Sequence, residues 1–385
     1  TFSSGSYAVI YTDHNTTDGS SYGMFGVVYH ADKDLFSSAF QINTYTDSIQ
    51  YQGNTIAISE DKFIVVWDSN GQDKSSYGVY AQVFSIDKPT VTIKSTIDNG
   101  QVQYRTQDYS VSPLDYRIGD IGFGSLVIRE GAKIDSYQTI LGKTSTGQGS
   151  VSLSGESIYK SNSHVYIGKE GSGTWGMKEG SSVQSQTMTV GSGSSSTGTL
   201  TLEGQGTEWI VNQSTIVGGG GLGEVVISDN AILESKSMMI GNHNSGTLTL
   251  SKGQLKIGET VIVGDQGDAN MTIKDGSIIQ AKESKVATDL ASIVSLVMTG
   301  ETTGWYTEES FIMGSDGETT FQINQSDLHA KELIISKGSQ SETTLTMLGD
   351  KASLMTTLNM VIGEKGSCSM AVSRGVKKAR KSSRS

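Results

Sequence analysis

The chain has 385 residues, with 47 Gly, only 2 Pro, one Cys (Cys368) and a formal net charge of −11. The acidic balance argues against nucleic-acid binding, which needs clustered Lys and Arg, and a single cysteine excludes an internal disulfide. No apolar run is long enough for a membrane-spanning helix. Short alternating apolar runs between Gly-rich turns instead predict an all-β protein.

Residues 1–87 contain one sequence motif twice. Residues 6–30 match residues 61–85 once a single one-residue gap is allowed. Each copy has two alternating runs around a polar loop, which predicts a β-hairpin with one aromatic-rich buried face. The segment between the copies supplies two further strands, so we expect a small β module that is either propeller-like or a sandwich.

One loop of this module is the best candidate metal site in the sequence. Calcium takes about six to eight oxygen ligands from a tight turn that contains Gly, and this loop offers Asp68, Asn70 and Asp73. The spacing is not that of an EF-hand, and Asp, Asn and Gly are also the ordinary residues of hairpin turns. The module resembles repeats of large secreted bacterial proteins, many of them calcium-associated, and calcium is the one cofactor that the sequence suggests.

Residues 88–117 are expected to be a linker or cap. They contain both prolines, Pro89 and Pro113. Between the prolines, the residues 98–100 (Asp-Asn-Gly) predict the turn of a hairpin. A cap is expected here because the end of a solenoid otherwise exposes unpaired strand groups.

From residue 118 to 373 a repeat with a period of 22–27 residues predicts a parallel β-helix of about eleven coils. Each coil carries a marker residue after an apolar position, then a polar turn, an alternating run, a second turn and a third short apolar run. The markers are Gly119, Gly142, Gly168, Gly191, Gly218, Gly241, Gly264, Ala287, Gly314, Ser336 and Gly363. We expect three short strands per coil, a rod of about 50 Å from strand spacing, and glycine at positive φ in the corners. Coils with Ala287 and Ser336 are expected to be locally irregular.

Longer coils carry an insertion in which Gly and four further residues precede a large apolar residue, as in GQGTEW, which ends at Trp209, and GETTGW, which ends at Trp305. With the (V/I)G marker and phrases such as GTLTL (residues 246–250), this insertion resembles the repeats of autotransporter (type V secretion) and PEP-CTERM-associated passengers. The resemblance covers residues 118–373. It implies export to a bacterial cell surface.

The chain closes with a basic tail, residues 374–385, which is either a solvated end or an arm for an anionic partner. No catalytic motif is evident. The outward acidic residues are scattered, and the five His have no metal-ligand spacing. Trp209, Trp305 and Tyr306 are candidate sugar-stacking residues, although packing is the alternative role for a large apolar corner residue.

The sequence therefore predicts a non-enzymatic, secreted or surface-bound bacterial stalk or adhesin. Its expected partners are glycans, cell-surface proteins, or further copies that associate through coil edges. Two alternatives are a polysaccharide-active enzyme on a β-helix and a structural filament or matrix subunit.

Overall fold

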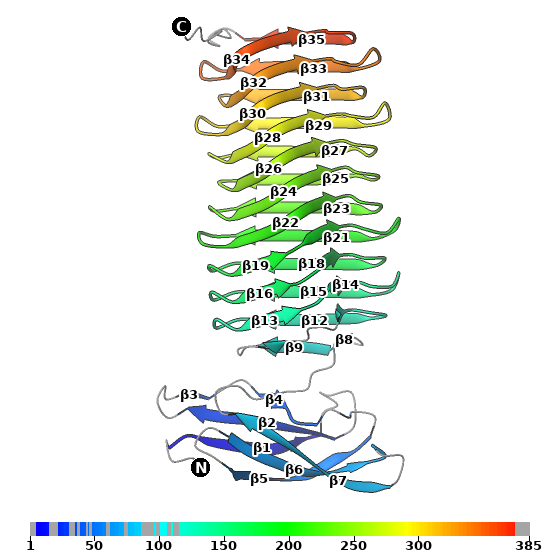
Figure 1. Cartoon of the computed structure of the whole chain (residues 1–385), viewed down its shortest axis with the longest axis vertical. Helices are drawn as coiled ribbons and strands as arrows, with labels where there is room; N and C mark the ends of the chain where they lie inside the picture. Colours follow the sequence, from blue (N-terminus) through cyan, green and yellow to red (C-terminus); the bar gives the residue numbers. More distant parts are fainter. Residues whose placement is uncertain are drawn as a thin grey trace.

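The computed structural model describes residues 115–373 without a break. Before them it describes residues 5–14, 22–30, 35–36, 39–43, 45, 48–58, 62–72, 76–85, 96–97, 101–105 and 109–110. All regular structure in these residues is β, as predicted: small antiparallel sheets followed by a parallel solenoid (Figure 1). Within the same residues there is no helix of the length and hydropathy needed to cross a membrane.

The first part consists of two small antiparallel sheets that share one apolar core, which includes Met24, Phe63 and Phe84. One sheet contains β1 (Tyr7–Asp13), β2 (Gly23–His30), β3 (Leu35–Phe36) and β4 (Phe40–Gln41). The other contains β5 (Gln50–Ala57), β6 (Lys62–Asn70) and β7 (Tyr77–Ser85). The two predicted sequence repeats are the hairpins β1–β2 and β6–β7.

The solenoid of about ten turns is built from two parallel sheets, and each coil contributes to both. The 12-stranded sheet contains β9 (Gln101–Arg105), β12 (Phe123–Ile128), β15 (Gln148–Leu153), β18 (Ser172–Met177), β21 (Thr197–Glu203), β23 (Leu222–Ser228), β25 (Gly246–Ser251), β27 (Ala269–Lys274), β29 (Ile293–Thr299), β31 (Glu318–Asn324), β33 (Glu342–Leu348) and β35 (Ser367–Val372). Neighbouring strands are in register, so equivalent residues of successive coils lie side by side.

In the 16-stranded sheet, the early coils supply two short strands each and the later coils one long bent strand. The short strands are β8 (Thr96–Ile97), β10 (Tyr109–Ser110), β11 (Tyr116–Ile118), β13 (Lys133–Ser136), β14 (Thr139–Leu141), β16 (Ile158–Ser161), β17 (His164–Ile167), β19 (Ser182–Ser185) and β20 (Thr187–Val190). The long strands are β22 (Glu208–Val217), β24 (Ile232–Ile240), β26 (Gln254–Val263), β28 (Ile278–Val286), β30 (Gly304–Met313), β32 (Asp327–Ile335) and β34 (Ser353–Ile362). A register shift in the middle of each long strand marks the bend, for example between Ala281 and Ser284. The three predicted strands per coil are thus separate in the early coils and partly fused in the later ones.

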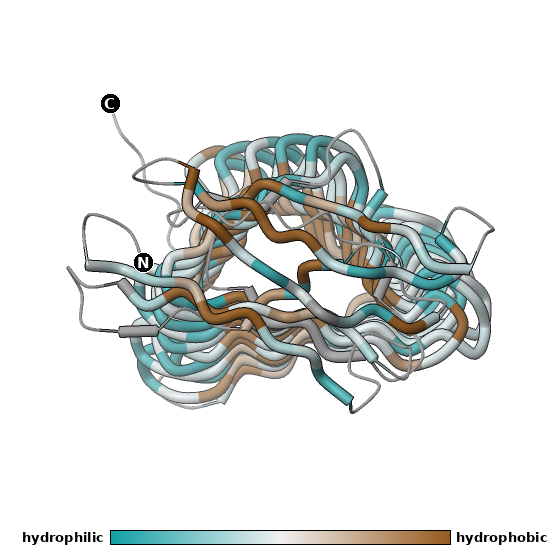
Figure 2. Tube along the Cα trace, turned by 90° about the horizontal axis from the view of Figure 1, so that it is seen from below, coloured by the Kyte–Doolittle hydropathy of each residue, from teal (hydrophilic) through white to brown (hydrophobic). Residues whose placement is uncertain are grey.

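One apolar core fills the interior of every coil. Leu126, Val151, Trp175, Leu200 and Val225 are in register on successive strands, and each is at most 1% exposed. Seen along the stack, hydrophobic residues recur at the same places around the ring (Figure 2). Burial of each such side chain contributes roughly 1.5–3 kcal/mol.

The marker residues occupy the corner after each bent strand. All eleven have positive φ, between 51° and 76°. At most of the marker glycines, an added Cβ would clash with the next coil. At Gly241, for example, it would lie 2.3 Å from the carbonyl oxygen of Asp268. Ala287 and Ser336 keep the same left-handed conformation, with φ of 51° and 56°. The expected irregularity at these two coils is therefore wrong, because the ladder holds their backbone in place.

Residues 96–110 begin the solenoid earlier than predicted. β8 pairs with β11 and β9 pairs with β12, both in parallel and in different sheets. The strands on either side of the predicted turn pair with the following coil and not with each other, so they do not form the predicted hairpin. Residues 98–100 themselves lie outside the described residues. These strands form a first rung paired with the next coil, and the rest of the predicted linker lies largely outside the described residues.

Candidate functional site

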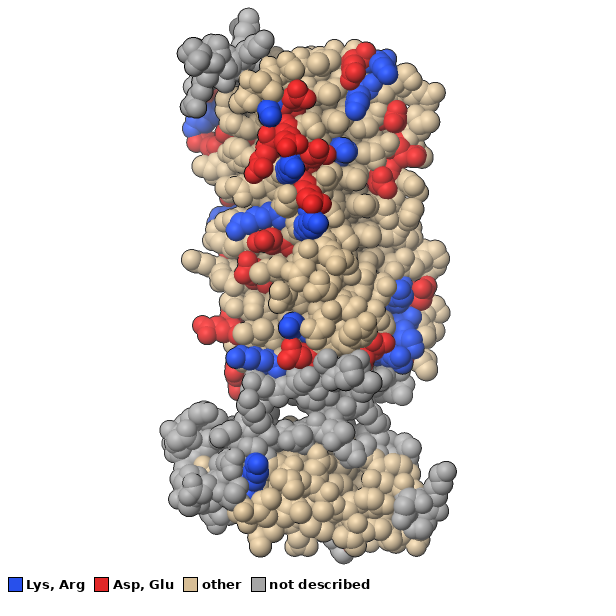
Figure 3. Space-filling view, in the orientation of Figure 1, with Lys and Arg blue, Asp and Glu red and all other residues tan. Residues whose placement is uncertain are grey.

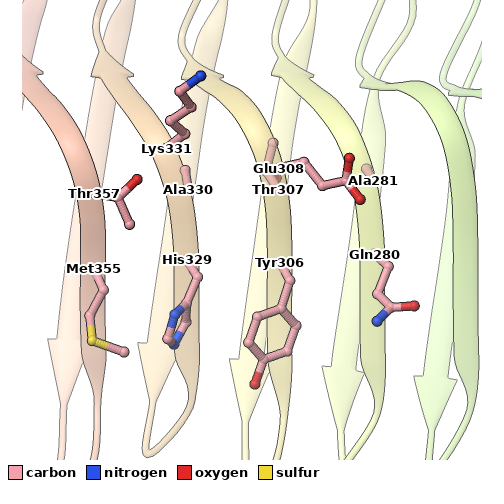
Figure 4. A pocket seen from close by; sticks show the side chains of 10 residues that line it. All are labelled: Gln280, Ala281, Tyr306, Thr307, Glu308, His329, Ala330, Lys331, Met355 and Thr357. Carbon is pink, nitrogen blue, oxygen red and sulfur yellow. The ribbon is translucent and has the colours of Figure 1, made fainter.

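A groove of about 390 Å³ lies on the outer face of the 16-stranded sheet, where β28, β30, β32 and β34 bend (Figure 4). Buried Ala281 and Ala330, which belong to the apolar core, are among its lining residues. The larger side chains that line it, and that could contact a ligand, are those of Gln280, Tyr306, Glu308, His329, Lys331 and Met355. The groove lies where the strands bend, at the register shifts that follow Ala281 and Thr307.

Four of these side chains form a row along the stack. Gln280, Tyr306, His329 and Met355 are in register on successive strands. The rings of Tyr306 and His329 lie 4.9 Å apart at 38°, and 37% of Tyr306 is exposed. The row therefore presents one half-exposed aromatic ring supported by a second ring.

Gly304 makes room for the Tyr306 ring. A Cβ on Gly304 would lie 2.5–2.7 Å from two ring carbons and the hydroxyl oxygen of Tyr306. The equivalent residue on the next strand is Asp327, whose carboxylate accepts a hydrogen bond from the hydroxyl of Ser353. Burial raises the pKa of Tyr306, and the charge of Asp327 adds to this. Burial lowers the pKa of His329, and the charge of Asp327 partly opposes this shift.

Charged residues follow the bend from coil to coil, with alternating sign. Lys236 pairs with Glu259 at 3.3 Å, and Lys282 pairs with Glu309 at 3.7 Å. Lys331 continues the row on β32. Figure 3 shows acidic and basic side chains interspersed over the C-terminal coils.

Two charged groups of the groove have no ion pair among the described residues: Glu308 and Lys331. Their neighbours are engaged, since Glu283 pairs with Lys285 at 3.4 Å and Glu332 accepts a hydrogen bond from Asn359 at 3.3 Å. Glu308 and Lys331 are both exposed. They offer a free acceptor and a free donor at the edge of the aromatic row.

The structure separates the three predicted stacking residues. Trp209 and Trp305 are 0% exposed, and each indole N–H donates to a core serine, Ser185 and Ser284 respectively. Their burial contradicts a stacking role, because no ligand reaches either ring. Tyr306 alone points outward, because it follows Trp305 on the same strand and adjacent residues face opposite sides.

The predicted calcium loop is only partly described. Asp68 and Asn70 lie on β6, on the face opposite the buried Phe63, Val65 and Trp67. Asp73 lies outside the described residues. Within the described residues, no group of three or more His, Cys, Asp or Glu is placed to hold a metal ion. A calcium site in this loop stays a prediction from the sequence.

Some outward acidic residues that looked scattered in the sequence share one corner of successive coils. Glu130, Glu156 and Glu179 all have positive φ in the turn after the 12-stranded sheet, and the amide of Glu156 donates to the carbonyl of Glu179 at 2.9 Å. Glu130 and Glu179 each pair with the basic residue before them, at 3.7 and 3.3 Å. The row is a series of equivalent turns in which two of the three carboxylates pair with a neighbouring cation.

No protein-family model, no curated protein and no solved structure matches this chain. The class is therefore defined by the fold and the site alone: a parallel β-solenoid with an aromatic and polar groove on its outer face.

Proposed function

We propose that this protein is a non-enzymatic bacterial surface stalk or adhesin passenger, which holds a binding surface away from the cell. One observation carries the proposal: a single apolar cluster extends from Tyr116 to Leu354 through every coil. Coils that share one core stabilise each other and act as a continuous body with long outer faces. The groove lies on one of these faces, on the C-terminal coils.

The extracellular, bacterial part of the proposal depends on the sequence. It is supported by the resemblance of residues 118–373 to autotransporter and PEP-CTERM-associated repeats. A solenoid fold is compatible with enzymes as well as with binding proteins, so a polysaccharide-active enzyme is the alternative function.

Antibody labelling of the cells that produce the protein tests the location. We expect labelling of intact cells, and labelling only after permeabilisation would overturn it. Incubation of the purified chain with a polysaccharide panel tests the non-enzymatic part. Unchanged polymer length is expected, whereas release of shorter products would favour the enzyme.

A filament or matrix subunit is the second candidate, and one observation favours it. On the last described strands, side chains at core-facing positions are exposed: Ile362 by 48%, Met370 by 39% and Val372 by 53%. A second copy seated on this rung would cover them and pair the open strand edges. Light scattering over a range of concentrations distinguishes the candidates, because a filament subunit grows in mass and an isolated stalk does not.

A further inference from the structure

The groove of β28, β30, β32 and β34 has the chemistry of a sugar site. A half-exposed aromatic ring, Tyr306, lies between hydrogen-bonding groups, Gln280 on the preceding strand and His329 on the following one. Pyranose rings combine an apolar face of C–H groups with a rim of hydroxyls. An aromatic ring flanked by polar groups matches both parts.

A peptide fits this groove less well. Peptides commonly bind by adding a strand to an open sheet edge or by filling apolar pockets. β28, β30 and β32 are paired on both sides, so their backbone groups are already used. The large apolar or aromatic side chains that line the groove are limited to Tyr306 and Met355, apart from His329.

The charge around the groove selects among sugars. The strands that carry it hold five carboxylates and three ammonium groups, namely Glu283, Glu308, Glu309, Asp327 and Glu332 against Lys282, Lys285 and Lys331. This excess of negative charge repels sulfated or uronate-rich chains. A neutral sugar instead accepts hydrogen bonds from Lys331 and donates them to Glu308, both of which lack ion pairs among residues 115–373.

We propose that this groove binds an uncharged oligosaccharide, with Tyr306 stacked on one ring and Gln280, Glu308 and Lys331 bonded to hydroxyls. The proposal rests on the adhesin function, and it names the ligand class of that surface. The row runs along the stack, with one residue per coil at a spacing of about 4.8 Å. A linear oligosaccharide therefore lies across the strands and contacts several coils.

The test is binding of the full chain to an array of neutral and acidic oligosaccharides, followed by calorimetry with the best neutral binder. Tyr306→Ala should weaken binding by about tenfold or more, the loss of one stacking contact. Gly304→Ala should also weaken binding, because the new methyl group displaces the Tyr306 ring while leaving it present. Tyr137→Ala is the matched control, since Tyr137 is a 48% exposed tyrosine of another coil, and it should bind like the unmodified chain.

Three results would overturn the groove proposal: the tightest binders are polyanionic, Tyr137→Ala loses as much affinity as Tyr306→Ala, or no neutral oligosaccharide binds. If the chain still labels intact cells in the last case, the surface function survives and only the ligand class is wrong. If Tyr306→Ala abolishes binding but the unmodified chain also cleaves the sugar, the site is correct and the non-enzymatic function is wrong. Thermal denaturation of each variant confirms that it is folded.

Discussion

Inside the solenoid, the indole Nε1 of Trp209 donates a hydrogen bond of 3.0 Å to the hydroxyl of Ser185, one rung earlier in the stack. Both side chains are 0% exposed, so no water replaces either partner. The bond ties one coil to the next within an otherwise apolar core.

Replacing Ser185 by Ala is expected to lower the free energy of unfolding by about 1–3 kcal/mol, because it leaves a buried N–H without an acceptor. Ser326→Ala is the control: the Ser326 hydroxyl is equally buried and has no hydrogen-bond partner. That control should be neutral or slightly stabilising. Chemical denaturation measures the free energy of unfolding of both variants. Equal losses would show that the hydrogen bond from Trp209 does not account for the effect of Ser185→Ala.

The corner glycines are expected to tolerate a methyl group only where the next coil leaves space. Gly131→Ala should cost about 1–2 kcal/mol, because φ is positive but no atom lies within 4 Å of the new Cβ. Gly241→Ala adds a backbone clash and should cost about 1–3 kcal/mol more. Denaturation midpoints test the difference. Similar losses would mean that the corner relaxes freely.

A ladder in the 12-stranded sheet changes from small to larger residues along the stack. Gly124, Gly149 and four further glycines are followed in register by Ala269, Val294, Thr319, Thr343 and Cys368. Thr319 is 1% exposed and its hydroxyl has no partner.

Thr319→Val should therefore stabilise the protein by about 1 kcal/mol, because it removes an unpaired buried hydroxyl while keeping the shape. Thr215→Val is the contrasting variant, since the hydroxyl of Thr215 donates to Ser235 at 3.1 Å. It should destabilise by a similar amount. Thermal unfolding of both variants gives the sign, and a destabilised Thr319→Val would contradict the explanation.

The stability of the solenoid is expected to fall as the pH is lowered from 6.5 toward 4. Burial, with a smaller effect of Lys169, lowers the pKa of His164 to about 4. Its ring contacts the hydroxyls of Thr187 and Thr189 and stacks on Tyr166 at 3.8 Å. Between these pH values the unfolded chain binds a proton at His164 and the folded chain does not, so protonation favours unfolding.

The destabilisation that comes from His164 is absent above about pH 6.5 and complete below about pH 4. His164→Gln should flatten the decline of the melting temperature over this range. His243→Gln, at an exposed histidine, should leave it unchanged. The interpretation fails if both variants retain the full slope.

The calcium prediction is tested by thermal unfolding with and without millimolar calcium. If Asp68, Asn70 and Asp73 hold the ion, calcium should raise the melting temperature by mass action. The rise should disappear in Asp68→Asn and in the presence of a chelator. Magnesium is the control cation, and an equal rise with magnesium, or no rise with calcium, would refute the site.

The sequence was sufficient for the regular part of the fold. The apolar residue before each marker fixed the coil period, and the left-handed corners followed from the glycines. It was insufficient for residues 96–105, because a local Asn-Gly turn signal competed with parallel pairing to residues more than 20 positions away. Non-local pairing of this kind leaves little trace in a short window.

The sequence predicts only one residue of the groove, Tyr306, and the reason is geometric. The sequence indicates Tyr306 as a stacking candidate, but no local motif marks Gln280, Glu308, His329 or Lys331. Residues on neighbouring strands, such as Gln280, Tyr306 and His329, are separated by more than 20 positions and meet only through strand register. Trp305 and Tyr306 are adjacent in sequence, and only the inside–outside alternation of β30 assigns one to the core and the other to the surface.

The alternating charges at the bend affect which coils pair with each other during folding. Lys236, Glu259, Lys282, Glu309 and Lys331 alternate in sign, and each surface pair adds only about 0–1 kcal/mol. Skipping one repeat during folding, however, would bring Lys236 beside Lys282. Repeated modules are prone to such misalignment, and this pattern makes the wrong neighbour electrostatically unfavourable.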